Sequence, residues 1–175
     1  MFGDDYDLQL TTNGSHINSF PAELFKKFQA IEISLYGLTA DEYLSNTGCF
    51  GAFNQVRAGC IMLSEADVDF RVALVINNDN WCQMEDYVRY AICVGTKRIG
   101  FALPSIGGKL LLDASDKWHL TAETKKMIYR KFRDIQNKLC TVHNNRPCKI
   151  GVSAIFGNVN TNARIFKIKC MHHLT

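Results

Sequence analysis

Short runs in which apolar and polar residues alternate recur along this chain, and they limit its fold more than any other feature. The clearest are FQAIEISLY (28–36) and VDFRVALVIN (68–77), which place their apolar side chains on one face. This period of two predicts a β-strand in each run. RIGFAL and KLLLD predict short strands around the turn PSIGGK, and CKIGVSAIFGNVNTNARIFKIKC (148–170) predicts a hairpin that turns near Asn158–Asn162.

Stretches with helical spacing separate these strands. Thr39 begins TADE, in which the Thr39 hydroxyl and the Glu42 carboxylate can each accept the other's backbone N–H group. This capping box predicts a helix over 40–50, which its two late glycines weaken. Apolar residues at helical spacing predict two more helices, over 81–94 and 121–140.

This mixture of strands, helices and terminal hairpins predicts an α+β fold. Its sheet is expected to be mainly antiparallel and packed by about three helices. Residues 1–20 are expected to form a flexible acidic arm, because Asn13-Gly14-Ser15 interrupts any periodicity there. Residues 21–175 are then a single globular domain that ends in the β-hairpin.

Composition narrows the class of protein. The chain has 175 residues, of which 47% are hydrophobic, enough for one domain with a substantial core. No apolar run approaches the roughly 18 residues of a membrane-spanning helix, and no secretory signal is visible. The seven cysteines are scattered, which favours free thiols in a reducing compartment, most of them buried as small apolar side chains.

Charge is divided unevenly along the chain. Residues 1–86 carry a net charge of −9 and residues 87–175 a net charge of +12. The strongest basic element is the helix predicted over 121–140, which suits the phosphates of RNA or anionic lipid head groups. Its cationic residues are Lys125, Lys126, Arg130, Lys131, Arg133 and Lys138. The alternative is that this is an ordinary solvated helix face and that the charges mix once the chain folds.

Signatures of catalysis are weak. SIGGKLLL lacks the upstream glycine and the hydroxyl residue of a phosphate-binding loop. The histidines and cysteines of the last third show no zinc-ligand spacing, and no cysteine lies in a recognisable nucleophile motif. We therefore expect no catalytic residue, no metal and no cofactor. A cysteine- or zinc-dependent enzyme remains an alternative.

Two segments carry a resemblance to a known family. FQAIEISLYGLTADEYLSNTGCFGAF and CKIGVSAIFGNVNTNARIFKIKC, together with the order of elements, resemble the matrix proteins of rhabdoviruses, in particular plant-infecting, cytorhabdovirus-like members. The resemblance implies a non-enzymatic structural protein that self-associates and bridges the nucleocapsid to the inner face of the envelope membrane during assembly and budding. It would lie in the virion beneath the envelope, and in host cytoplasm and at host membranes as a peripheral protein. The chain departs from animal-virus members in its acidic arm and in having no P-P-x-Y motif, so the resemblance does not extend to recruitment of host sorting machinery through that motif.

The resemblance also implies a use for the arm, which would dock on the core of the next subunit in a head-to-tail oligomer. Its apolar anchors would be Phe2, Tyr6, Leu8 and Leu10, and its acidic residues, facing the basic half of the neighbour, would be Asp4, Asp5 and Asp7. The basic helix would bind the nucleocapsid or the anionic membrane. The first alternative function is a small RNA-binding protein or silencing suppressor that uses the same helix.

Overall fold

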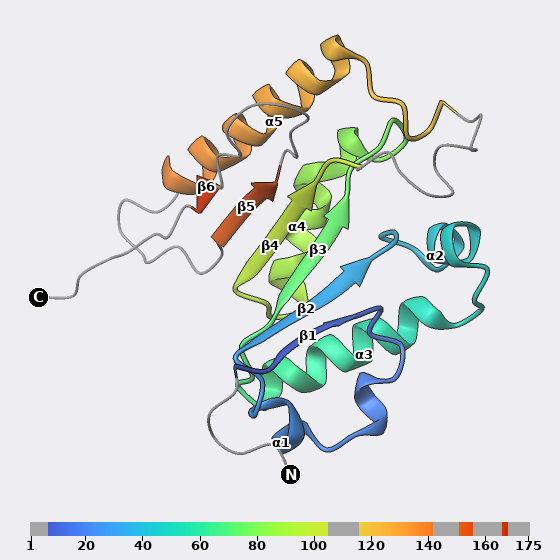
Figure 1. The fold of residues 1–175 in the computed structure, drawn as a ribbon, viewed down its shortest axis with the longest axis vertical. Coiled ribbons are helices and arrows are strands. Elements are labelled where there is room, and N and C mark those ends of the chain that lie inside the picture. Colours follow the sequence, from blue (N-terminus) through green and yellow to red (C-terminus); the bar gives the residue numbers. More distant parts are fainter. Residues whose placement is uncertain (1–6, 105–115, 142–150, 156–165, 168–175) are drawn as a thin grey trace, which may run out of the picture.

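The computed structural model describes residues 7–104, 116–141, 151–155 and 166–167. Six strands form one sheet in the order β1-β2-β3-β4-β5-β6 (Figure 1). They are β1 (Gln9–Thr12), β2 (Ala30–Leu35), β3 (Arg71–Val75), β4 (Arg98–Ala102), β5 (Gly151–Ile155) and β6 (Phe166–Lys167). Neighbouring strands from β1 to β5 are parallel, and β6 is antiparallel to β5.

Helices connect the parallel strands in a regular, Rossmann-like alternation. They are the 3-10 turns η1 (Ile17–Ser19) and η2 (Trp81–Gln83) and the helices α1 (Ala22–Phe25), α2 (Ala40–Thr47), α3 (Ala52–Glu65), α4 (Met84–Cys93) and α5 (Ala122–Thr141). Each connection returns the chain to the end of the sheet at which the previous strand began. A parallel strand needs such a crossover, whereas a hairpin would make the next strand antiparallel.

The predicted α+β class is therefore wrong, and the fold is α/β with a parallel sheet. The error began within residues 1–20, where Gln9–Thr12 form β1, which pairs with β2 from Gln9↔Ala30 to Thr12↔Ile33. Ile17 of the same region is buried in the core. With β1 unrecognised, the regular alternation of strand and helix was hidden.

Several individual elements were predicted correctly. The strand over 28–36 is β2, and the helices over 81–94 and 121–140 are confirmed as η2 with α4 and as α5. The helix over 40–50 ends earlier, at Thr47, where Gly48 and Gly51 adopt left-handed φ angles of 69° and 78° and separate α2 from α3. The closing hairpin is confirmed by the antiparallel pairing of β5 with β6, although its predicted turn and KLLLD lie outside the described residues.

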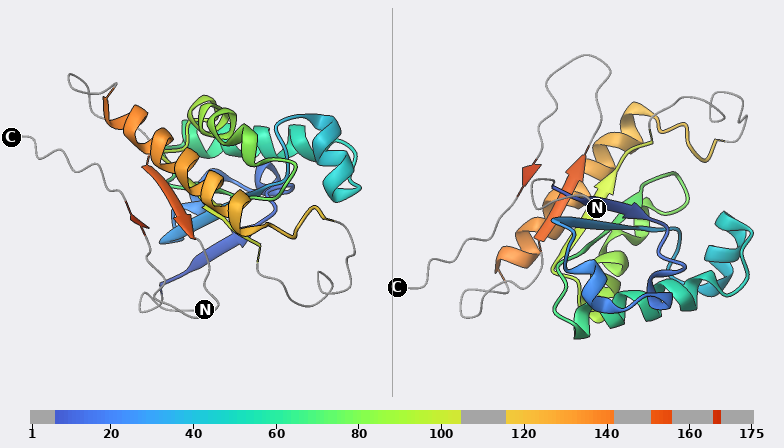
Figure 2. Two further views of the ribbon diagram at one scale, coloured as in Figure 1. Left: turned by 90° about the horizontal axis from the view of Figure 1, so that it is seen from above. Right: turned by 60° about the horizontal axis from the view of Figure 1, so that its bottom comes forward.

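The strands are added in one direction only, and this decides where the helices lie. Because β-α-β crossovers are right-handed, a strand order that never reverses places every connecting helix on the same face of the sheet. Figure 2 shows α2, α3 and α4 together on one side of the strands. Helix α5 joins them, since Phe132 packs edge-on against Phe101 of β4 with ring centroids 6.5 Å apart. The molecule thus has two layers.

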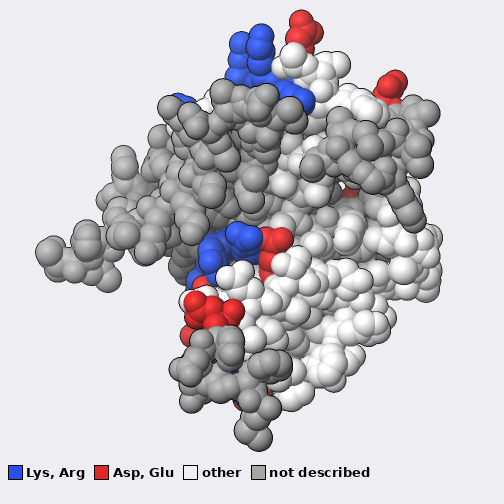
Figure 3. Space-filling model, viewed as in Figure 1, with Lys and Arg blue, Asp and Glu red and all other residues white. Residues whose placement is uncertain are grey.

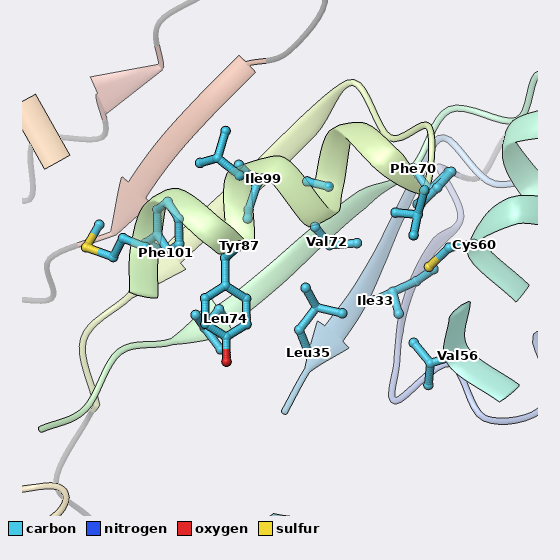
Figure 4. Close-up of a cluster of buried hydrophobic side chains, with 14 of the residues drawn as sticks. Ile33, Leu35, Val56, Cys60, Phe70, Val72, Leu74, Tyr87, Ile99 and Phe101 are labelled. Atoms are coloured by element: carbon cyan, nitrogen blue, oxygen red, sulfur yellow. The ribbon is translucent and has the colours of Figure 1, made fainter. Parts of the chain in front are cut away.

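The core lies between these layers. Alternate residues of β2, β3 and β4 point toward the helices and are almost completely buried, while their neighbours on each strand are not. The buried strand residues are Ile31 and, as Figure 4 shows, Ile33, Leu35, Val72, Leu74, Ile99 and Phe101. From the helices, Val56 and Cys60 of α3 and Tyr87 of α4 fill the space against them. Burial of side chains of this size contributes about 1.5–3 kcal/mol each, so the helix side supplies most of the stability.

Candidate functional site on the open face of the sheet

The face of the sheet opposite the helices carries a different set of side chains. Strand register places Thr11, Glu32 and Arg71 side by side in one row, and Arg98 of β4 continues it. We call these four residues the charged row. The next row toward the carboxyl ends consists of Ser34, Ala73 and Gly100, and we call it the small-residue row.

The charged row is internally paired. The Arg71 guanidinium forms an ion pair with Glu32 on the adjacent strand, and Arg98 Nη2 lies 2.9 Å from the Asp69 carboxylate. These side chains are partly exposed, so each pair is screened by water. Figure 3 shows basic and acidic side chains gathered together near the middle of this face. Arg98 Nε is buried and has no hydrogen-bond partner among the described residues, which leaves one donor unused.

The small-residue row leaves the backbone of the sheet accessible. None of its three side chains is larger than that of serine, and all three residues are partly exposed. Register continues the row to Ser153 of β5. Glycine and other small residues within a strand are typical of places where a ligand or another backbone approaches closely.

Polar loops follow the strands at the carboxyl edge, beyond the small-residue row. After β3, the buried Asn77 accepts backbone N–H groups from Asp79 and Asn80 at 2.9 and 3.1 Å. Asn80 Oδ1 accepts the N–H of Asn77 at 2.8 Å, and its Nδ2 donates to the Val75 carbonyl. The two asparagines therefore hold the loop in one conformation through side-chain to backbone bonds.

A lysine connects this loop to its surroundings. Lys117 Nζ donates to Asn46 Oδ1 of α2 at 2.7 Å and lies 3.6 Å from Asp79 Oδ2. Asn78 Nδ2 donates to the carbonyls of Asp116 and His119, so the segment that precedes α5 is attached to the loop after β3. The carboxyl edge is thus a connected polar rim.

The predicted capping box is half correct. Thr39 Oγ1 accepts the N–H of Glu42 at 3.2 Å, as expected. The Glu42 carboxylate, however, accepts the N–H of Leu38 rather than that of Thr39, and its other oxygen accepts from Gln83 Nε2 at 3.3 Å. Glu42 therefore links α2 to the start of the α4 region.

Most of the predicted arm residues cannot be placed. Phe2, Asp4, Asp5 and Tyr6 lie outside the described residues. Asp7 and Leu8 are exposed just before β1, and Leu10 is part of β1 and packs against the core. Leu10 is therefore an internal contact of the domain, while docking of the others on a second subunit stays a prediction.

The residues of the basic helix are brought together as predicted. Ile128, Phe132 and Ile135 of α5 are buried, and Lys125, Lys126, Arg130 and Arg133 are exposed. The remaining two cations make contacts that the sequence did not predict. Lys131 Nζ donates to the Cys82 carbonyl at 2.5 Å and lies 6.0 Å from the centre of the Trp81 ring. Lys138 Nζ lies 2.7 Å from Glu85 Oε1, so both lysines attach α5 to the α4 region.

The cysteines are less buried than expected. Cys60 packs in the core, where burial raises the pKa of its thiol to about 12, but Cys49, Cys82 and Cys93 are exposed. Within the described part of the chain, no cluster of His, Cys, Asp or Glu side chains is arranged to hold a metal ion. Cys148 and Cys170, two of the cysteines in the last third of the chain, lie outside the described residues. Among the helices of the described residues, none is long and apolar enough to span a membrane.

Sequence reasoning missed the open face because each strand was considered alone. The signal was present in the residues that alternate with the apolar ones, which are charged or small in all three central strands: Glu32 and Ser34, Arg71 and Ala73, and Arg98 and Gly100. Only the parallel register brings them into rows. Beyond the chain itself, no protein-family model and no curated protein matches this sequence.

Proposed function

We propose that the open face binds a small polar ligand and that the chain is a ligand-binding α/β protein. The observation that carries this proposal is a parallel sheet with one face that no described helix covers, where small side chains lie beside a row of arginines and acids. Parallel sheets are ordinarily covered on both faces. Winding in one direction with all helices on one side is also the arrangement of β/α barrels, whose ligands bind at the carboxyl ends of the strands.

The chemistry of the two rows suggests the kind of ligand. The small-residue row would let a flat group lie close to the sheet, and the Ser34 hydroxyl would offer one hydrogen bond. Arg71 and Arg98 would orient acceptor groups, while Glu32 would accept from donor groups. A molecule with both donors and acceptors fits best, a class that includes nucleosides, nucleotides and amino acids.

The test fills the floor of the proposed site. Ala73→Leu places a bulky side chain in the small-residue row, and Ala30→Leu is the matched control on the same face of the sheet, at the amino end of β2. The thermal unfolding midpoint of each protein is measured with a panel of nucleosides, nucleotides and amino acids. We expect a ligand that raises the midpoint of the wild-type and Ala30→Leu proteins but not that of Ala73→Leu. A panel that shifts none of the midpoints, or a shift that survives in Ala73→Leu, would contradict the proposal.

A second candidate function is favoured by α5. Its exposed cations support the prediction of a self-associating viral matrix protein that bridges a nucleocapsid and an anionic membrane. The order of elements supports this candidate less than it did, because the sheet is parallel. The exposed cations of α5 are therefore the observation that supports the matrix-protein candidate.

Charge reversal tests this second candidate. Lys125, Lys126, Arg130 and Arg133 are changed together to glutamate, and Lys131 is left intact because it contacts Cys82 and Trp81. The control reverses Lys26 and Lys27, which are exposed after α1. Each cation near an anionic surface contributes about 1 kcal/mol, so flotation with anionic liposomes should be lost only in the α5 variant. Retained binding to liposomes and nucleocapsids would exclude this role, and tight binding to naked RNA would favour the RNA-binding alternative.

A further inference from the structure

The sheet has two edges among the described strands, and they differ in charge. At one edge, β6 consists of Phe166 and Lys167. A lysine on an edge strand is a common protection against pairing with another chain. At the other edge, β1 has the sequence QLTT, without a charged residue or a proline, and its register with β2 is continuous. The edge at β1 therefore has neither the charge, the proline nor the bulge that commonly blocks pairing.

The outer side of β1 offers backbone groups for hydrogen bonding. The Gln29 N–H donates to the Leu8 carbonyl at 2.8 Å, so the backbone carbonyl of Leu8 points toward β2. Backbone groups alternate in direction along a strand, hence those of Gln9 and Thr11 point outward. No described strand lies on that side, and the left view of Figure 2 shows β1 as the outermost strand. Unpaired groups of this kind are a template for another strand.

The side chains around this edge favour a protein neighbour. From Leu8 to Ala22 the chain holds no Asp, Glu, Lys or Arg, although 21% of all its residues are charged. Figure 3 shows a broad area of described surface without basic or acidic side chains, in the region where Figure 1 places α3 and the end of β1. Charged residues are depleted in the same way at the centres of protein–protein interfaces.

Burial at this edge is incomplete. Leu10 lies opposite Ile31 in the register and therefore shares the helix side of the sheet. Ile31 is 1% exposed, whereas Leu10 is only partly buried, because no described strand lies beyond it. Leu8, two residues earlier, is 39% exposed. A further strand with an apolar residue opposite Leu10 would extend the packed layer.

From these observations we infer that β1 pairs in antiparallel fashion with β1 of a second copy of this chain, across a two-fold axis at Leu10. Gln9 of each copy then stands opposite Thr11 of the other, and both pairs exchange N–H···O bonds through their outward groups. The two Leu10 residues form the pair between them, in which the backbones are not bonded to each other and the side chains are closest. The two sheets become one continuous sheet.

A second copy fits this edge better than an unrelated strand, because β1 is complementary to itself. Its two outward residues are placed symmetrically about Leu10, so one strand supplies both halves of a two-fold interface. Asp7, the charged residue nearest in sequence, stands opposite the uncharged Asn13, and no like charges meet. The inference does not rest on the proposed function, because the contact uses the backbone of β1 and neither the arginines nor the small-residue row.

The first experiment removes one outward donor. Thr11→Pro deletes the N–H that faces away from β2, a change that edge strands tolerate. Thr11→Val is the matched control, since it keeps the N–H and a β-branched side chain. Sedimentation equilibrium of the full chain under reducing conditions measures association over a range of concentrations, and thermal unfolding at low concentration checks that both variants fold.

We expect a monomer–dimer equilibrium for the wild-type protein and a change of less than about twofold in Thr11→Val. Thr11→Pro should weaken association by about tenfold or more, because each dimer loses two hydrogen bonds, one from each copy.

The second experiment tests the register, and it decides the question even if Thr11→Pro does not fold. In the inferred dimer the two Leu10 residues are directly opposite, with Cα atoms about 4.5 Å apart, which a disulfide can bridge. The two Thr11 residues are not opposite each other. Mild oxidation should therefore link two copies of Leu10→Cys through residue 10 but should not link Thr11→Cys through residue 11. Peptide mapping distinguishes these bonds from those of the native exposed cysteines.

Several outcomes would overturn the inference. A wild-type protein that is monomeric at every concentration would mean that no second copy occupies the edge. Assembly without limit would indicate a head-to-tail contact, such as β1 of one copy with β6 of the next. Equal association of Thr11→Pro and the wild-type protein, or equal losses in Thr11→Pro and Thr11→Val, would show that the outward backbone of β1 is not the contact.

Discussion

The two faces of the sheet in this protein differ in the size and burial of their side chains. Toward the helices, residues such as Ile33 and Val72 are fully buried and packed against α3 and α4. On the other side, their immediate neighbours Ser34 and Ala73 are small and partly exposed. Because successive residues of a strand point in opposite directions, one strand serves both purposes at once. Burial on the helix side supplies most of the stability, whereas substitutions on the open face should change the stability little.

The difference also shows what limits the open face. A large apolar side chain there would remain in water if nothing covered it, which favours association between molecules. Small and charged side chains avoid that cost while leaving the sheet accessible. The same small and charged residues that tolerate contact with water thus make the face available to a polar ligand.

The sharpest test of the comparison places one charge on each face. Val72→Asp buries a carboxylate among the helices, whereas Ala73→Asp exposes it on the open face. We expect the first change to lower the free energy of unfolding by about 4 kcal/mol or more and the second by less than about 1 kcal/mol. Urea unfolding of the two variants measures the difference. Similar losses would mean that the open face is covered in solution.

A smaller effect is expected in the loop after β1, where Gly14 lies close to the residues that pack on the helix side of the sheet. Gly14 has a φ of 78°, and a Cβ placed there would lie 2.8 Å from Ile33 Cγ2. Gly48 has a similar φ of 69°, but nothing lies within 4 Å of its Cβ position. Gly14→Ala should therefore destabilise the protein by about 1–3 kcal/mol, and Gly48→Ala by the backbone strain alone, about 1 kcal/mol. Thermal unfolding would contradict the close approach if the two losses were equal.

The smallest expected effect lies on the solvent side of the helix layer. The hydrogen bond from Lys138 lowers the pKa of Glu85, and burial opposes it in part. A lowered pKa stabilises the fold above the ordinary range of a glutamate and loses this contribution as the pH falls through the folded value. Lys138 is exposed and Glu85 is partly exposed, so water screens the pair, and Glu85→Gln should cost less than about 1 kcal/mol at neutral pH and nothing in acid. A loss that is the same at both pH values would show that the charge is not involved.

The sequence predicted individual elements better than their arrangement. The apolar alternation of β2 and the helical spacing of α5 are local properties, and both elements formed where expected. Strand direction is not local, and it depends on whether each connection crosses over. Alternation is common in antiparallel sheets with one solvated face, whereas parallel strands usually read as continuous apolar runs. Here the open face gives parallel strands the alternating pattern, which favoured the wrong class.

The candidate site was missed for a related reason. Arg71 and Arg98 are 27 positions apart in the sequence and meet only through the register of β3 with β4. No local sequence motif indicates that these two arginines lie on neighbouring strands. The basic face of α5, by contrast, is a property of one helix, and the sequence predicted the burial of Ile128 and the exposure of Lys125 directly.

The strand order has a consequence for how the chain can fold. Each of the strands β1 to β5 is hydrogen-bonded to the strand that comes next in the sequence, so each pair forms between consecutive strands. The cost in entropy of bringing two strands together grows with the length of chain between them. During synthesis, β2 can pair with β1 as soon as it leaves the ribosome, and β3 can then add to an edge that already exists. The sheet can therefore grow in the order of translation, because each new strand pairs with an edge strand that has already been synthesised.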